Sequence, residues 1–285
     1  MLKKMLVIAL ISIMSVLVFL IIPLVPLRAF ADVITLRADN WYPYNGEPNS
    51  EKPGYIIEIA DHIFKKAGHQ IDYKLLNWAR TCKEVESGKW NGAVGGSYGE
   101  NSGCIFSEEE LGIMQNTFYI KKGAATWRYE GIESLKLVKV GIIKDYSYGN
   151  DELNKYLQQR EAPFVQVVHG DNPLESNIKK LLLDRIDVVI EDKSVFEAMA
   201  HKMGVLRDVE IAGTLPTDES NYVFIAFSPN NPKSKEYANL ITEGVREMRA
   251  NGKLKEILSS YGLEVGCPNR HIWLAHDLAP PLRVL

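Results

Sequence analysis

The sequence predicts an α/β protein of two lobes with a ligand cleft between them. From Val33 onward, short β-type runs alternate with helical stretches, and a second series of the same kind begins near Leu137. Strands that alternate with helices form sheets with parallel members. The 285 residues, 46% of them hydrophobic, give enough length and apolar content for two such lobes.

The first series has three predicted strands and two helices. The run Val33–Ala38 predicts a strand, and the segment 55–67 has apolar residues at helical spacing. Gly68 suits the left-handed backbone position that follows a helix. The series continues with a strand at 71–75, a helix at 79–87 and a strand at 92–97.

The second series repeats this order and is followed by a closing segment. Asn172-Pro173 places a capping residue before proline at the first helical position, so free backbone N–H groups should follow the strand 164–168. Such a helix start attracts anions. The expected elements are strands at 138–143, 164–168, 187–190, 209–211 and 222–227, and helices at 151–160, 173–183, 193–203, 232–250 and 253–260.

We expect the chain to cross between the lobes twice, near 120–123 and 215–219. The first lobe then comprises 32–121 and a return segment, 219–263, and the second comprises 122–218. No interpretation is offered for the tail, 264–285. Because ligands bind outside the carboxyl ends of strands in such sheets, six loops should face the cleft: 39–54, 76–80, 97–105, 144–150, 169–174 and 191–193.

Residues 1–31 are predicted to be a secretory signal peptide. Two lysines precede an uncharged run over 5–27, and the small-residue signal Ala29-Phe30-Ala31 follows, so we expect cleavage after Ala31. The run is also long enough to span a bilayer, which leaves an uncleaved anchor as the alternative.

Cleavage removes three basic residues and no acidic one, so 30 basic and 36 acidic residues remain, a formal net charge of −6. Without a basic excess, no nucleic-acid partner is expected.

The three cysteines, Cys82, Cys104 and Cys267, have no metal-site spacing, and we expect no metal or other cofactor. Outside the inner membrane the compartment is oxidising, so we predict a disulfide between Cys82 and Cys104, each near the carboxyl edge of the first sheet.

Another motif, Gly95-Gly96-Ser97-Tyr98-Gly99, fits the G-x-S-x-G pattern of hydrolases. That pattern needs a helix directly after the serine, which the glycines here disfavour. We therefore interpret Ser97 as a ligand-binding residue.

Five short sequence motifs follow one another along the chain. They are Asp39-Asn40-Trp41-Tyr42-Pro43-Tyr44, Gly54 before its helix, Trp78 with Gly88 and Asn91, the segment 183–192, and the C-terminal segment 248–263. In order and spacing, the chain resembles the family 3 extracellular solute-binding proteins, periplasmic receptors of polar amino acid ABC transporters, over about 33–263. The resemblance implies a type II periplasmic-binding-protein fold and a monomeric periplasmic protein that is not an enzyme. It would capture a small polar solute and deliver it to an inner-membrane ABC permease.

The chain departs from this family where the ligand carboxylate is usually held. Members that bind α-amino acids usually carry Thr-x-x-Arg after the third strand, whereas the segment 99–104 has no arginine. We therefore expect Arg80, near a cleft-facing helix start, to hold an anionic group of the ligand. The family's Phe-Ser-x-Pro-Tyr segment is also reduced here, to 116–119.

The remaining candidates are aromatic and polar residues at strand ends. Trp41, Tyr44 and Trp78 could stack on a flat or cationic ligand, or pack inside the lobe. Asp192 should accept from a positive or hydrogen-donating ligand group, with a helix-cap role as its alternative. Asn172 precedes the helix whose N–H groups should face an acceptor on the same ligand. The role of Glu191 is ambiguous.

Two other functions remain open on the sequence. A protein of this kind could be sensory, with a closed form that docks on a membrane-bound sensor in place of a permease. A dehydratase-like enzyme on the same two lobes would need an acid/base pair in the cleft, for which Glu100 and Asp192 are the candidates.

Overall fold

The structure is a computed structural model in which residues 31–123, 126–149, 151–159, 164–170, 172–265 and 272–273 are described. The expected signal peptide, apart from its last residue, lies outside these residues, as does Cys267. Within the described ranges, no helix is both long and apolar enough to cross a membrane.

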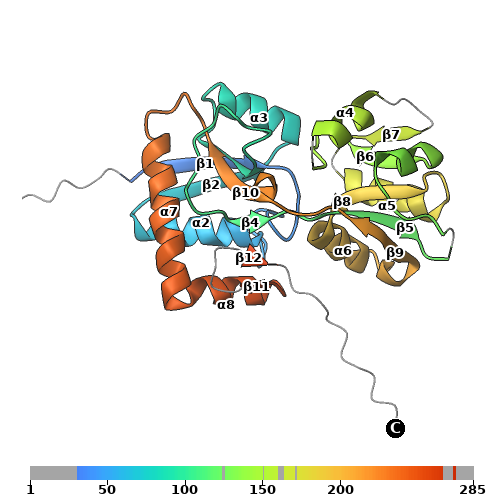
Figure 1. Ribbon diagram of the computed structural model, residues 1–285. Helices are drawn as coiled ribbons and strands as arrows, with labels where there is room; N and C mark the ends of the chain where they lie inside the picture. The colour runs from blue at the N-terminus through green and yellow to red at the C-terminus, as the bar shows by residue number, and fades with distance from the viewer. Residues whose placement is uncertain are drawn as a thin grey trace, which may run out of the picture. The chain divides into compact units, whose positions relative to one another are not determined.

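The first lobe is built on a five-stranded sheet of order β2-β1-β3-β10-β4. β1 pairs in parallel with β2 and β3, and the returning β10 runs antiparallel between β3 and β4. Helices α2, α7 and α8 pack against one another, whereas α3 contacts β1 and β3 (Figure 1). The bounds are β1 Val33–Ala38, α2 Tyr55–Lys66, β2 Gln70–Leu75, α3 Trp78–Glu86, β3 Gly92–Gly96, β4 Gly112–Ile113, β10 Tyr222–Phe227, α7 Ser234–Asn251 and α8 Lys253–Ser260.

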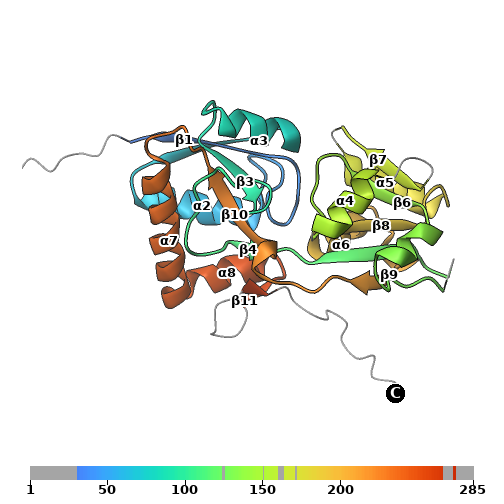
Figure 2. The same cartoon turned by 45° about the horizontal axis from the view of Figure 1, so that its top comes forward.

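The second lobe has a five-stranded sheet of order β7-β6-β8-β5-β9 (Figure 2). β6 is parallel to β7 and β8, and β5 is antiparallel to β8 and β9. Successive residues of β8 face opposite ways: Val189 joins the cluster that contains α5 and α6, and Val188 joins that of α4. The bounds are β5 Asn116–Lys121, β6 Val140–Ile143, α4 Asp151–Gln159, β7 Val165–Val168, α5 Pro173–Leu182, β8 Val188–Asp192, α6 Lys193–Lys202 and β9 Val209–Thr214.

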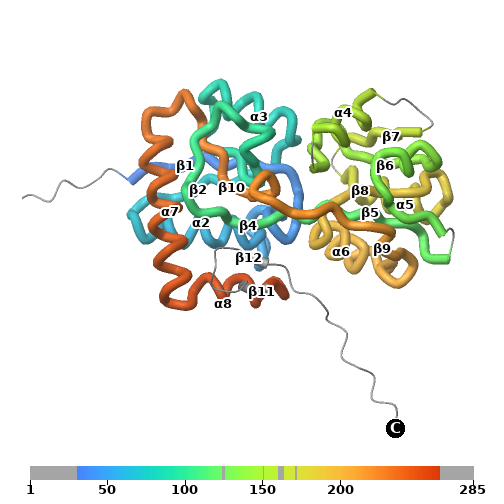
Figure 3. Tube along the Cα trace, viewed as in Figure 1, coloured from blue at the N-terminus to red at the C-terminus, as the bar shows by residue number. Residues whose placement is uncertain are grey.

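The first crossing between the lobes differs from the expectation. β4 ends at Ile113 in the first sheet and β5 begins at Asn116 in the second, so the chain crosses at 114–115 and the expected boundary after 121 is wrong (Figure 3). β5 is a buried antiparallel strand that no helix follows directly, so strand–helix alternation gave no sign of it. The second passage runs between β9 and β10, over 215–221.

Short elements complete the fold. In the described part of the chain, three 3₁₀ helices lie at Ile132–Leu137, Leu206–Asp208 and Glu219–Asn221. In the tail, for which the sequence offered no interpretation, β11 (Glu264–Val265) pairs antiparallel with β12 (Ile272–Trp273).

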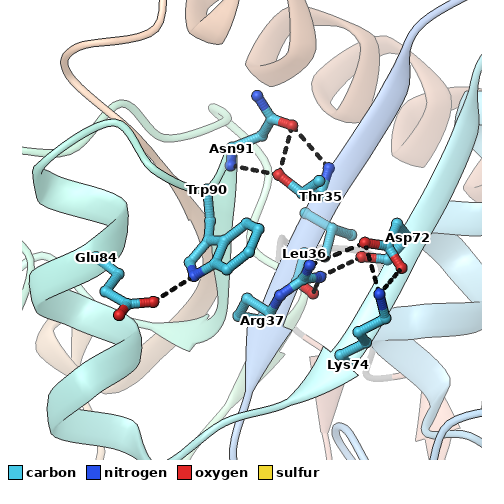
Figure 4. Close-up of polar contacts among 8 residues, drawn as sticks. All are labelled: Thr35, Leu36, Arg37, Asp72, Lys74, Glu84, Trp90 and Asn91. Atoms are coloured by element: carbon cyan, nitrogen blue, oxygen red, sulfur yellow. Dashed lines mark hydrogen bonds and ion pairs between the residues drawn. The ribbon is translucent and has the colours of Figure 1, made fainter.

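A buried arginine ties β1, β2 and α3 of the first lobe together (Figure 4). Arg37 of β1 is 3% exposed, and its Nη2 donates to Asp72 Oδ2 of β2 at 2.8 Å. Its guanidinium lies 4.1 Å from the ring centroid of Trp90, whose Nε1 donates to Glu84 of α3 at 2.7 Å. Because a buried charge is tolerated only with such partners, this network holds the strand that leads directly to Asp39.

Gly54, at the start of α2, should be the least replaceable glycine near the cleft loops. Its φ is +110°, and a Cβ there would lie 2.5 Å from Asn45 Cα and Tyr44 O. We expect Gly54→Ala to lower the free energy of unfolding in urea by about 3 kcal/mol. Gly68→Ala is the control, with φ +87° and no atom within 4 Å, and should cost about 1 kcal/mol. Equal losses would contradict the steric explanation.

Candidate ligand-binding site

Two adjoining pockets lie where the predicted cleft loops meet, and they share Trp41 and Tyr146. We call them the Trp78 pocket and the Asn172 pocket. Each of the six loops contributes to at least one of them. The Trp78 pocket is lined by Asp39, Trp41, Trp78, Val94, Gly95, Ser97, Glu100, Met114, Tyr146, Ser147 and Val223. The Asn172 pocket, of about 370 Å³, is lined by residues that include Trp41, Lys52, Tyr146, Asn172, Glu191, His201 and Lys202.

Trp41 forms a wall of both pockets because the loop after β1 folds back on itself. Trp41 N donates to Asn45 O at 2.8 Å, and Tyr44 N donates to Trp41 O at 3.0 Å. This turn stacks the two rings, with centroids 4.1 Å apart and planes 17° apart. Tyr44 is fully buried and lines neither pocket, so the expected contact between Tyr44 and a ligand is wrong. Its ring instead packs against Trp41.

Two carboxyl groups of the first lobe accept hydrogen bonds from the loop after β6 in the second lobe. Tyr146 Oη donates to Asp39 Oδ2, and Ser147 N donates to Glu100 Oε1 at 2.8 Å. Burial raises the pKa of Asp39 to about 6 and the pKa of Glu100 to about 7. Tyr146 was not among the residues singled out in the sequence, although its loop was expected at the cleft.

Two carboxyl groups of the second lobe accept hydrogen bonds from the aromatic loop of the first. Trp41 Nε1 donates to Glu191 Oε1 at 3.1 Å, and Tyr44 Oη lies 3.3 Å from Asp192 Oδ2. Burial raises the pKa of Glu191 to about 8, and the nearby Asp192 and Asp39 act in the same direction. Burial also raises the pKa of Asp192 to about 6, although backbone N–H donors oppose the shift.

Asp192 is a helix cap and has no oxygen left for a ligand. Its Oδ1 accepts from the backbone N–H groups of Ser194 and Val195, and its Oδ2 accepts from the N–H of Gln115. Tyr44 Oη lies 3.3 Å from Oδ2 and 2.8 Å from Ile113 O, so its one proton is shared between these two acceptors. Both oxygens of Asp192 are therefore occupied, and Asp192 lines neither pocket. The expected ligand contact is therefore wrong, and the alternative assignment as the cap of α6 holds.

Glu191, whose role is ambiguous in the sequence, has one carboxyl oxygen without a hydrogen-bond partner among the described residues. Its Oε1 accepts from Trp41 Nε1 and from Asp192 N. Its Oε2 is buried and has no hydrogen-bond partner among the described residues, while the side chain lines the Asn172 pocket. A buried acceptor without a donor is costly, so this atom marks a place where a donor from a ligand would be stabilising.

Arg80 lies on the wrong face of its helix to hold a ligand. The buried face of α3 carries Trp78, Thr81 and Val85, and position 80 falls outside that stripe. The Arg80 side chain is 61% exposed, and its Nε donates to Glu84 Oε1 at 2.9 Å. Arg80 lines neither pocket, so its expected anion contact is wrong, whereas Trp78 lines the pocket named after it.

Cys82 and Cys104 are free thiols, so the predicted disulfide is wrong. Both pack in one small apolar cluster that includes Trp78 and Ala226. Burial raises the pKa of Cys82 to about 12 and that of Cys104 to about 11. The thiolate is the reactive form, so burial leaves both groups unreactive at neutral pH.

Ser97 and Asn172 each line one of the two pockets. The backbone around Ser97 is not the strand–helix turn that a hydrolase nucleophile requires. Ser97 lines the Trp78 pocket, and a turn, not a helix, follows it at 98–100. Asn172 lines the other pocket directly before α5, and its side chain makes no capping hydrogen bond. Across the described residues, no three His, Cys, Asp or Glu side chains are grouped so that they could hold a metal ion.

The raised pKa of Glu191 predicts a stability that falls with rising pH. In the unfolded chain this carboxyl has its ordinary pKa of 4.5, and in the folded chain burial raises the pKa to about 8. Between these values the folded state holds the extra proton, so the free energy of unfolding decreases as the pH rises through that window. Glu191→Gln mimics the protonated group and should raise the melting temperature at pH 8.5 by about 2–4 °C or more.

The same variant should change little at pH 5, where the parent carboxyl is already neutral. Glu133→Gln, at a side chain that is 81% exposed, controls for the loss of one negative charge and should show no such pH dependence. A Glu191→Gln variant that is less stable than the parent at pH 8.5 would contradict this assignment. Thermal unfolding followed by circular dichroism measures all three proteins.

Known proteins share this two-lobed architecture. The chain is 19% identical over 234 residues to the probable amino-acid-binding protein YxeM of Bacillus subtilis (strain 168), covering 77% of this chain and 80% of that protein. An ancestral arginine-binding protein bound to arginine superposes with a TM-score of 0.65 at 21% identity, covering 80% and 97% of the two chains. A histidine kinase sensor domain similar to periplasmic binding proteins gives a TM-score of 0.64 at 17% identity, covering 80% and 95%.

The family match extends over most of the chain. The profile of the bacterial extracellular solute-binding proteins, family 3, matches residues 34–264. This range includes both sheets, the two passages between the lobes and all the residues of the two pockets. The chain therefore belongs to family 3 of the bacterial extracellular solute-binding proteins.

Proposed function

We propose that this protein is a periplasmic receptor that captures a small polar solute, an amino acid or a related compound, and delivers it to an ABC permease. The observation that carries the proposal is the set of three carboxyl groups that line the pockets, Asp39, Glu100 and Glu191. Each accepts a hydrogen bond from a residue of the opposite lobe. A solute that adds contacts to both lobes would favour the closed form, because a ligand shifts such an equilibrium by its differential affinity.

Binding without catalysis fits the site better than a dehydratase-like reaction does. An acid/base pair requires two titratable groups that both reach the reacting atoms. Of the two candidates from the sequence, Glu100 lines the Trp78 pocket, but Asp192 lines neither pocket and accepts from three backbone N–H groups. The arrangement therefore supports a binding site more than a reaction centre.

A sensory role is the second candidate, because a histidine kinase sensor domain has the same fold. Transport and sensing both require a site that binds the solute. They differ in the membrane protein that the solute-loaded form contacts, a permease or a sensor. Crosslinking of the solute-loaded protein in the native membrane distinguishes them: a permease supports the proposal, and recovery of a sensor kinase instead supports the alternative.

The solute should bind against Trp41. Native mass spectrometry detects the bound solute, and calorimetry measures how much a variant weakens its binding. We expect the protein purified from the periplasm to carry a small molecule that dissociates on unfolding. After the protein is stripped and refolded, Trp41→Ala should weaken rebinding of that molecule at least tenfold, because an aromatic wall of both pockets is removed.

Arg80→Ala is the matched control, since its side chain pairs with Glu84 outside both pockets. It should bind the same molecule within threefold of the parent protein. If neither the purified protein nor a broad metabolite screen yields a bound solute, the receptor proposal fails. If Arg80→Ala loses as much affinity as Trp41→Ala, this placement of the site is wrong.

A further inference from the structure

Three carboxyl groups, one buried and two half-buried, present acceptors to the two pockets. Asp39 and Glu100 line the Trp78 pocket, and Glu191 lines the Asn172 pocket. Glu191 is 2% exposed, and its Oε2 has no hydrogen-bond partner within the described part of the chain. Such an unsatisfied acceptor calls for a donor, and a positively charged donor forms the stronger bond.

The walls between these carboxyl groups are aromatic. Trp41 and Tyr146 line both pockets, and Trp78 lines one of them. Aromatic faces attract organic cations such as ammonium and guanidinium groups. Hard metal cations instead require shells of six or more oxygen ligands. The combination of carboxyl groups and aromatic rings therefore favours an organic cation.

The Trp78 pocket offers no cationic side chain for a solute carboxylate. None of its described lining residues is a lysine, arginine or histidine. Arg80, the expected substitute for the missing family arginine, donates to Glu84 on the exposed face of α3. The Asn172 pocket does have cationic residues, but Lys52, His201 and Lys202 are all exposed, and Lys52 Nζ donates to Ser260 O.

The pocket sizes suggest where each part of a solute would lie. The Trp78 pocket, of about 40 Å³, is the smaller of the two and has room for a small group such as an ammonium. The Asn172 pocket, of about 370 Å³, can hold a longer chain. Because Trp41 and Tyr146 border both pockets, an elongated solute could pass along them from one set of carboxyl groups to the other.

We infer that the solute is an elongated organic cation without a carboxylate, a diamine or an aminoalkyl guanidine, with one nitrogen group near Asp39 and Glu100 and the other at Glu191 Oε2. This inference rests on the proposed receptor function and specifies its substrate class. It separates this chain from receptors that recognise the α-carboxylate of an amino acid, because the buried site supplies acceptors at both ends.

Isothermal titration calorimetry on the stripped, signal-free protein at pH 7.5 tests the inference with pairs that differ only by a carboxylate. The probes are agmatine against arginine and cadaverine against lysine. In at least one pair the amine should bind at least tenfold more tightly than its amino acid. Glu191→Gln should weaken that amine at least tenfold, whereas Arg80→Ala should stay within threefold.

Each other outcome decides the question. Equal or tighter binding of arginine or lysine overturns the inference, as does saturable binding of magnesium or calcium chloride that displaces the amine. If none of the four probes binds, mass spectrometry of the copurified solute decides: a cation without a carboxylate supports the inference, and a neutral or acidic solute overturns it while the receptor function stands. A protein that binds no small solute at all removes the receptor function itself.

Discussion

The cost of taking carboxyl groups out of water is the constraint on which the arrangement of the two pockets depends. A buried carboxyl must be neutral, or must receive hydrogen bonds or a positive charge. Asp39, Glu100, Glu191 and Asp192 meet this demand with donors from the opposite lobe and with raised pKa values. Contact between the lobes and protonation of the site are therefore linked, and a cationic solute would relieve the same cost without a proton.

The rest of the first lobe holds these groups in place. The buried Arg37 joins β1 to β2 and, through Trp90, to α3, so the strand that ends before Asp39 and the helix that begins at Trp78 share one network. The backbone turn after β1 stacks Trp41 on Tyr44. A rigid aromatic wall results, and little conformational entropy remains to be lost there when a solute binds.

Sequence periodicity predicts where strands and helices lie, but it does not predict which of their side chains reach a pocket. The strand Val33–Ala38 and the start of α2 at Tyr55 lie where the apolar pattern placed them. Arg80 was misassigned because the face of α3 that is buried depends on the sheet beneath it. The expected ligand contact of Asp192 is wrong because neighbouring strand residues point to opposite faces, and the packed structure shows that Glu191, whose role the sequence leaves ambiguous, lines a pocket.

Apolar spacing, turn residues and the carboxyl ends of strands are local features, and from them the sequence predicts the alternation of strands and helices and the loops that meet at the two pockets. The order of its motifs indicates the family. Packing between distant parts of the chain places β5 in the second sheet, keeps Cys82 and Cys104 free and brings Tyr146 to Asp39. Tyr146 and Asp39 lie 107 residues apart, so no local pattern encodes their contact.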